Sequence, residues 1–216
     1  MKIKAVLYDM DGTLLDTEKL HKRAWTVTAA KRGVTMGPEF YQGAMGRNLT
    51  RVFALIEELY PNIGDIWSLY EEKEALCRKW MEEGGVPVLP GVYHTLGLLK
   101  ALGVKQCVCT STSRDSAEKT LTSAGILPKL DALMCGDDLE KSKPDPQIFL
   151  RGAQKLNTPI EECAVVEDAP AGVEAGLRSG ARVFIVPGML EMPQEFEARC
   201  TRINSLWELP TRLEEA

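Results

Sequence analysis

The sequence predicts an α/β fold: a doubly wound, Rossmann-like parallel sheet that carries an inserted all-helical cap. The first observation is a set of short apolar runs that are too continuous for half-exposed strands and that suit a parallel sheet covered on both faces. The second is that helical patterns separate the later runs, as right-handed crossovers require. The third is a long helical interval after the first run, without a buried strand. The predicted strands are residues 3–8, 105–109, 132–135, 163–166 and 182–186.

After its first strand the chain leaves the predicted sheet for a helical stretch. A first helix is expected over residues 18–32, because Gly33 is the usual kind of stop. Apolar side chains then recur at helical spacing over residues 49–60 and again over residues 66–81. These patterns predict helices that bury one face against each other.

The predicted domain organisation follows from this interval. We expect a helical cap over residues 15–86, inserted into an α/β core made of residues 1–14 and 87–216. The glycines and prolines between residues 84 and 91 mark the return to the core, where a hinge is expected.

Helical patterns also fill the gaps between the later strands. Apolar spacing predicts helices over residues 91–102 and 114–124. A further helix is expected over residues 145–156, with an aspartate as its cap and a proline in its first turn. Another is expected over residues 170–179, opened by a proline and ended by a glycine. The last segment holds three side chains that we expect to dock on the core: Leu206, Trp207 and Leu209.

The amino-acid composition limits the classes of protein to which the chain can belong. Of the 216 residues, 44% are hydrophobic and 26% charged, as in an ordinary soluble globular protein. The formal net charge of -5 argues against nucleic-acid binding and against binding to anionic membranes.

No apolar stretch approaches the roughly 18 residues of a membrane span, and no signal-peptide pattern opens the chain. The six scattered cysteines favour reduced thiols in a cytoplasmic protein over a disulfide framework. Nothing in the sequence requires more than a monomer.

Two carboxylates stand at the end of the first predicted strand. Asp9 and Asp11 are two residues apart, so they share one side of the strand. Gly12 then lets the chain turn and leaves room for a ligand. Ionised groups beside a buried strand need a cation or strong donors, and Mg2+ prefers oxygen ligands and accompanies substrate phosphates. The pattern therefore predicts a Mg2+ site.

Polar residues also follow the other predicted strands, at the edge where doubly wound sheets bind ligands. Residues 110–113 follow the second strand, Lys143 lies beyond the third, and Glu167-Asp168 end the fourth. Pro144 biases Lys143 toward an extended backbone, so that its side chain is not wound into a helix. Singly, these residues have plainer explanations as helix caps, turns or a solvated lysine. Their combination at strand ends favours a catalytic site.

With these residues in place, the chain resembles the phosphatases of the haloacid dehalogenase superfamily that carry a helical cap after the first strand, in the branch that includes β-phosphoglucomutase. The segment from Asp9 to Thr13 is similar to the first family motif, and Thr110 with Ser111 is similar to the second. Lys143 is similar to the third motif and Glu167-Asp168 to the fourth.

The resemblance implies a Mg2+-dependent hydrolase of small phosphate esters that works through an aspartyl phosphate. Asp9 would be the nucleophile, and Asp11 would protonate the leaving oxygen and then activate water. Thr110 would hydrogen-bond a phosphoryl oxygen, and Lys143 would offset negative charge. The implied metal ligands are the carboxylates of Asp9 and Asp168, the main-chain carbonyl of Asp11, and Glu167 either directly or through water.

The cap is expected to select the substrate. Thr17 and His21 are four residues apart, which places them on one face of the first cap helix. Arg47 falls in a loop, from which it would reach a second anionic or hydroxylated part of the substrate. The plainer explanations are a surface arginine and a histidine that tethers its helix. The expected substrate contacts near the second motif are Ser111, Thr112 and Arg114.

Alternatives to a phosphatase stay open. A phosphosugar mutase shares the spacing of the residues after the first motif, but it needs a phosphate anchor in the cap. Lys73 and Lys79 lie in a stretch with a solvated pattern, and Thr13 stands where that branch often has an apolar residue. A phospho-accepting signalling domain would place its acidic pair after the first strand, not after the fourth. The acidic pair Asp137-Asp138 favours turn and helix-capping chemistry over a second metal site.

Overall fold

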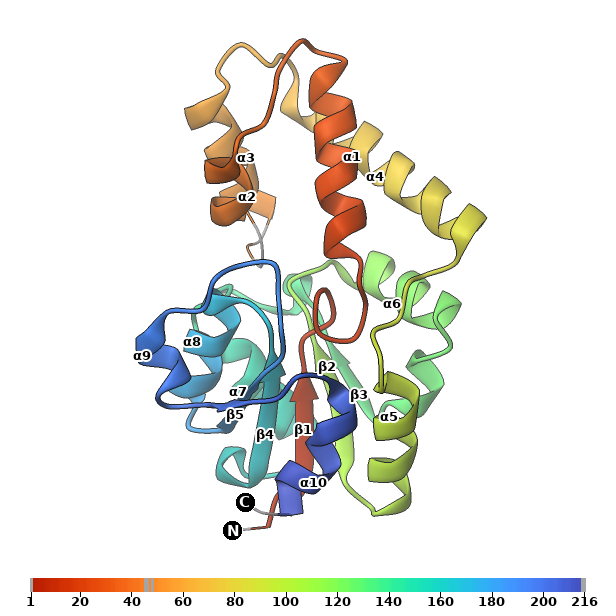
Figure 1. Cartoon of the computed structure of the whole chain (residues 1–216), viewed down its shortest axis with the longest axis vertical. Helices are drawn as coiled ribbons and strands as arrows, with labels where there is room; N and C mark the ends of the chain where they lie inside the picture. The colour runs from red at the N-terminus through yellow and green to blue at the C-terminus, as the bar shows by residue number, and fades with distance from the viewer. Residues whose placement is uncertain (1, 45–46, 48, 215–216) are drawn as a thin grey trace.

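The core of the protein is a parallel sheet. The structure, a computed structural model, describes residues 2–44, 47 and 49–214. In this described part of the chain, six strands pair in parallel in the order β3-β2-β1-β4-β5-β6. Figure 1 labels β1 to β5 of this sheet. Five of them confirm predicted strands, whereas β6 was not predicted, because two residues at a sheet edge leave no apolar run. The strands are β1 (Ala5–Tyr8), β2 (Lys105–Cys109), β3 (Ala132–Met134), β4 (Cys163–Glu167), β5 (Arg182–Ile185) and β6 (Thr201–Arg202).

Apolar side chains cover both faces of this sheet. Alternate residues of β1 belong to two separate buried clusters, because successive strand residues point to opposite faces. One cluster packs against α5 (Val92–Ala101), α6 (Arg114–Ser123) and α10 (Leu209–Glu214). The other packs against α7 (Gln147–Lys155) and α8 (Pro170–Ser179). Helices thus flank the sheet on both sides (Figure 1), and the predicted doubly wound α/β class is confirmed.

A second group of helices lies beyond the carboxyl ends of the strands (Figure 1). Its members are α1 (Glu18–Ala30), α2 (Pro38–Ala44), α3 (Leu49–Leu59) and α4 (Ile66–Gly84). They bury an apolar cluster of their own, in which Phe40 meets Trp25 edge-on with ring centroids 5.6 Å apart. The helical cap is therefore present. Helix α2 was not predicted, because Phe40 is its one buried residue and a single apolar contact makes no periodic face.

The two connections between the core and the cap run side by side. The main-chain nitrogen of Leu89 donates to the carbonyl of Leu14 at 3.0 Å, and that of Asp16 donates to the carbonyl of Pro87 at 2.9 Å. An antiparallel bridge lies between these two hydrogen bonds. Paired connections are a suitable place for a hinge, although the exact cap boundaries at residues 15–86 stay a prediction.

The C-terminal segment docks on the core through the three predicted side chains. Leu206 and Leu209 are buried. Trp207 is 55% exposed and packs on the surface of α5 beside His94, with ring centroids 4.5 Å apart. Its side chain points away from those of its neighbours because it sits in a 3-10 turn. The remaining short elements are α9 (Gln194–Glu197) and the 3-10 turns Leu127–Lys129, Gly136–Asp138, Ile160–Glu162 and Leu206–Glu208.

Two further expectations concern compartment and membrane. None of the helices in the described part of the chain combines the length and the apolar character that crossing a bilayer requires. All six cysteines are free thiols, and five of them are buried.

Candidate active site

A cavity lies between the carboxyl ends of the strands and the cap. Its volume is about 580 Å³, and residues of both the core and the cap line it. The floor lies between the ends of β1 and β4, where the chain leaves β1 toward β2 on one side and leaves β4 toward β5 on the other. Such a switch point opens a crevice in a doubly wound sheet.

Lys143 lies at the centre of the cavity floor. Its ammonium donates to the carboxylate of Asp9, to Oε1 of Glu167 at 2.6 Å and to the carbonyl of Cys109 at 3.1 Å. The side chain is 2% exposed. Burial acts to lower the pKa of Lys143, but the two carboxylates beside it raise the pKa above its ordinary value. The ammonium therefore keeps its charge although it is buried.

Three carboxylates converge beside this lysine. Ligand oxygens of Asp9, Glu167 and Asp168 all lie within 4.8 Å of one another. Burial raises the pKa of Asp9, and Lys143 works against that rise. Burial and then Glu167 raise the pKa of Asp168. A cluster of buried oxygen donors with one lysine leaves negative charge uncompensated, and this donor set fits a hard divalent cation such as Mg2+.

The backbone around these carboxylates has no room for larger residues. Gly12 has a φ of +85°, and a Cβ there would overlap the carboxylate of Asp168. In α8, a Cβ at Gly172 would overlap the carboxylate of Glu167. Both glycines are therefore required by close approach, and at Gly12 the positive φ adds to the requirement.

Glu167 differs from its acidic neighbours in that both of its oxygens have protein partners. Oε1 accepts from Lys143, whereas Oε2 accepts from the main-chain nitrogens of Asp168 at 3.0 Å and Ala169 at 3.2 Å. The carboxylate thus connects the lysine to the turn that follows β4. Its oxygens are less available to a metal ion than those of Asp9 and Asp168.

Asp11 is held apart from the acidic cluster. The hydroxyl of Thr17, from the cap, donates to Oδ1, and the hydroxyl of Thr112 donates to Oδ2 at 3.1 Å. Burial raises the pKa of Asp11, and these hydrogen bonds oppose the rise. The predicted substrate contacts Thr17 and Thr112 therefore lie in the site, but each hydroxyl has Asp11 as a partner. The hydroxyl of buried Thr110 accepts from the main-chain nitrogen of Thr112 at 3.1 Å.

The cap side of the cavity contains a lysine that the sequence pattern did not single out. Lys73 is buried, and its ammonium contacts Nδ1 of His21 and Oε1 of Glu74, the latter at 2.7 Å. The interpretation of Lys73 as solvated is wrong. Its position between Leu69 and Cys77, both buried and each four residues away, was the available signal. For Lys79 the solvated interpretation is confirmed.

Arg47 and Ser111 also line the cavity. Arg47 is exposed, and its guanidinium donates to the main-chain carbonyl of Lys143 at 3.5 Å. The cap loop therefore contacts the core segment that carries the central lysine. Ser111 lies on the floor, next to Thr110.

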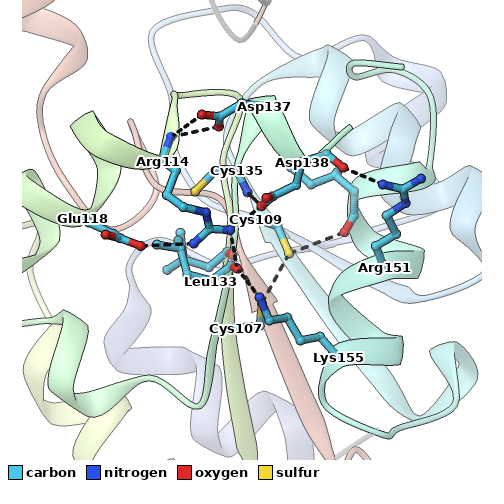
Figure 2. A network of polar contacts seen from close by, with 12 residues as sticks. Cys107, Cys109, Arg114, Glu118, Leu133, Cys135, Asp137, Asp138, Arg151 and Lys155 are labelled. Carbon is cyan, nitrogen blue, oxygen red and sulfur yellow. Dashed lines mark hydrogen bonds and ion pairs between the residues drawn. The ribbon is translucent and has the colours of Figure 1, made fainter. Parts of the chain in front are cut away.

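Arg114 is the one predicted substrate contact that the structure does not bring to the cavity. Figure 2 shows its guanidinium between Glu118, at 3.1 Å, and Asp138. It also donates to the carbonyl of Leu133, on the edge strand β3, at 3.5 Å. Arg114 is the first residue of α6, and its side chain extends along this edge of the sheet, away from the cavity. The carboxylate of Asp137 accepts from the main-chain nitrogen of Arg114 at 2.8 Å, which confirms the predicted capping role.

Comparison with known proteins decides the family. A sequence profile described as haloacid dehalogenase-like hydrolase matches residues 3–180. The chain belongs to the haloacid dehalogenase-like hydrolases. The family resemblance of the motifs is thereby confirmed, and the protein is an enzyme.

Relatives of this hydrolase support the same family. It is 33% identical to hexitol phosphatase A of Escherichia coli strain K12 over 198 residues, which cover 90% of this chain and 88% of the relative. CbbY of Rhodobacter sphaeroides, solved in complex with xylulose-(1,5)bisphosphate, is 26% identical with a TM-score of 0.80, and 96% of each chain is covered. A β-phosphoglucomutase of Clostridium difficile has a TM-score of 0.83 over 99% of this chain and 98% of its own; at 23% identity it supports the fold alone.

Replacement of Arg114 tests its reassignment to the sheet edge. We expect Arg114→Ala to lower the free energy of unfolding by about 1 kcal/mol, because partly exposed ion pairs contribute little. The affinity for a phosphate ester should stay within about twofold, since the guanidinium does not line the cavity. Urea denaturation and Michaelis–Menten kinetics measure the two effects. A large rise in KM with unchanged stability would restore Arg114 as a substrate contact.

The neutral imidazole of His21 predicts a pH dependence of stability. Burial, and then Lys73, lower the pKa of His21 below its ordinary value of 6.5. The unfolded chain therefore binds a proton at His21 more readily than the folded chain does. The contribution of the neutral imidazole to the free energy of unfolding is present above pH 6.5 and is lost as the pH falls below it. We expect the free energy of unfolding to fall less steeply between pH 6.5 and about pH 5 in His21→Gln than in the unsubstituted protein. Parallel slopes in urea denaturation would contradict the assignment.

Proposed function

We propose that this enzyme is a Mg2+-dependent phosphatase that hydrolyses a small phosphorylated metabolite through an aspartyl-phosphate intermediate. The observation that carries the proposal is the contact of Lys143 with Asp9 beside two further carboxylates, under a cavity that the cap also lines. The name of the relative hexitol phosphatase A supports phosphate-ester hydrolysis. The bisphosphate bound to Rhodobacter sphaeroides CbbY supports a phosphorylated carbohydrate as the class of substrate.

Asp9 is the proposed nucleophile. One carboxylate oxygen forms a bond to phosphorus while the ester oxygen leaves, and water then cleaves the acyl phosphate to free phosphate and the original carboxylate. Lys143 orients Asp9 through the hydrogen bond between them and offsets charge on the transferred group. Thr110 is the proposed donor to a phosphoryl oxygen, because its buried hydroxyl lies at the end of β2.

Asp11 is the proposed general acid and base. Its raised pKa favours a carboxyl that holds a proton for the leaving oxygen. After the alcohol departs, the carboxylate accepts a proton from the attacking water. The hydroxyls of Thr17 and Thr112 fix both oxygens, so the group is oriented from the cap and from the core at once. Full alignment of Asp11 thus depends on the position of the cap.

The proposed ligands of Mg2+ are the carboxylates of Asp9 and Asp168 and the main-chain carbonyl of Asp11. Glu167 is better placed to act through water, because both of its oxygens have protein partners. When bound, the ion offsets the repulsion between these carboxylates and the phosphate. A carbonyl ligand from Asp11 leaves its carboxyl free for proton transfer.

The cap is proposed to recognise the organic part of the substrate. Thr17, His21, Arg47, Ser111 and Thr112 all line the cavity, so each can contact it when it binds. The cap over residues 15–86 is proposed to move as a unit that excludes water from the acyl phosphate. The free thiols support a reducing, cytoplasmic location, and a monomer is the proposed state.

A phosphosugar mutase is the second candidate, and one observation favours it. Buried Lys73 supplies the cap cation that the sequence pattern did not indicate. Thr13 favours hydrolysis, because its hydroxyl donates to Asp168 at 3.3 Å and joins the polar floor. Release of one phosphate per sugar phosphate, without an isomeric sugar phosphate among the products, distinguishes the phosphatase from the mutase.

The nucleophile is tested by Asp9→Asn. We expect phosphate release from p-nitrophenyl phosphate and from a panel of sugar phosphates to fall at least about a thousandfold, because the amide cannot form the acyl phosphate. The unsubstituted enzyme should lose activity when Mg2+ is removed and regain it when Mg2+ is restored. Asp115→Asn is the matched control, since the side chain of Asp115 is 78% exposed on α6, pairs with Lys119 and does not line the cavity. Full activity of Asp9→Asn would refute the assignment.

A further inference from the structure

Four polar side chains cluster on the cap wall of the cavity. This cap polar cluster consists of His21, Tyr70, Lys73 and Glu74. Lys73 is 6% exposed at its side chain and is bonded to two other members, His21 and Glu74. Its ammonium also lies 5.5 Å from the ring of Trp25 and 5.9 Å from that of Tyr70. The cluster is thus internally bonded and backed by aromatic rings.

The cap polar cluster carries no net charge. The carboxylate of Glu74 lies 2.7 Å from the ammonium of Lys73 and cancels its charge. Burial, and then Lys73, lower the pKa of His21, so its imidazole is neutral near pH 7. Burial, and then Glu74, raise the pKa of Tyr70 to about 12, so its phenol is neutral as well. The cap polar cluster therefore presents hydrogen-bond donors and acceptors without an excess of positive charge.

The other cations that line the cap wall are exposed. Lys22 lies over the ring of Tyr41, 5.1 Å from its centroid, and Arg47 donates to the main-chain carbonyl of Lys143. Among the described lining residues of the cap, Lys73 is the buried cation. A phosphate dianion against this wall would meet Lys73 already neutralised and Glu74 beside it.

We propose that the cap polar cluster is a subsite for the uncharged, hydroxyl-bearing end of a phosphate monoester, and that Glu74 excludes esters with a second phosphate at that end. This inference rests on the proposed phosphatase function and names its substrate class as the monophosphate of a sugar or alditol. Hydroxyl groups donate and accept at once, which matches a wall of ammonium, carboxylate, imidazole and phenol. Specificity against the bisphosphate comes from like-charge repulsion by Glu74.

Titration calorimetry tests the subsite without turnover. The Asp9→Asn protein with Mg2+ is titrated with fructose 6-phosphate and fructose 1,6-bisphosphate, which differ by one phosphate. We expect the monophosphate to bind more tightly. Adding Glu74→Gln should raise the affinity for the bisphosphate relative to the monophosphate by at least about tenfold, since the ammonium of Lys73 loses its counter-charge. The matched control is Glu71→Gln, which removes the same charge from an exposed position of α4 and should leave the ratio unchanged.

Three results would overturn the subsite. They are tighter binding of the bisphosphate before Glu74 is changed, an unchanged ratio after Glu74→Gln, and an affinity of both sugar phosphates no greater than that of inorganic phosphate. Circular dichroism and the melting temperature establish that each variant is folded, and Glu74→Ala replaces Glu74→Gln if the latter is not. Failure of the phosphatase function would appear in the phosphate-release assay instead, because the titration requires no hydrolysis.

Discussion

The buried contact of Lys143 with Asp9 and Glu167 is the constraint on which the rest of the site depends. These groups come from the loop after β3 and from the ends of β1 and β4, so the parallel sheet must form before they meet. A buried charge is costly alone and tolerable with partners. Loss of one partner leaves the others uncompensated, so the stability of the core and the geometry of the site are coupled. One lysine does not balance three carboxylates, and this imbalance is the physical reason to expect a divalent cation.

The position of the cap affects both the orientation of Asp11 and the selection of the substrate. Thr17 of the cap shares Asp11 with Thr112 of the core, so the proposed acid and base is oriented only where the two parts meet. The paired connections near Leu14 and Leu89 are where the proposed hinge of the cap would lie. On the opposite wall, Glu74 neutralises Lys73. The floor thus concentrates charge for phosphoryl transfer, whereas the cap polar cluster carries no net charge and suits hydroxyl groups.

Local patterns in the sequence were sufficient to predict the core and its catalytic floor. Continuous apolar runs predict buried parallel strands, and the order of polar residues at strand ends brings Asp9, Lys143 and Glu167 together because parallel strands end at one edge. Long-range contacts decide the remaining features. Arg114 follows a motif segment, yet Asp138 and the edge of β3 draw it away from the cavity. Lys73 appears solvated in an amphipathic stretch until the packing of α1 against α4 buries it. The edge of β3 is far from Arg114 in sequence, and α1 is far from Lys73. For Lys73, the buried positions Leu69 and Cys77, each four residues away, were the signal in the spacing.

If Asp9 is the nucleophile, its carboxylate carries the phosphoryl group as an acyl phosphate during turnover. This is measured by mass spectrometry of the enzyme quenched in acid during steady-state hydrolysis of a sugar phosphate. We expect one phosphoryl group on the peptide that contains Asp9, lost when the quenched protein is treated with hydroxylamine or base. A phosphoryl group on another residue, or an unmodified peptide during rapid turnover, would contradict this assignment.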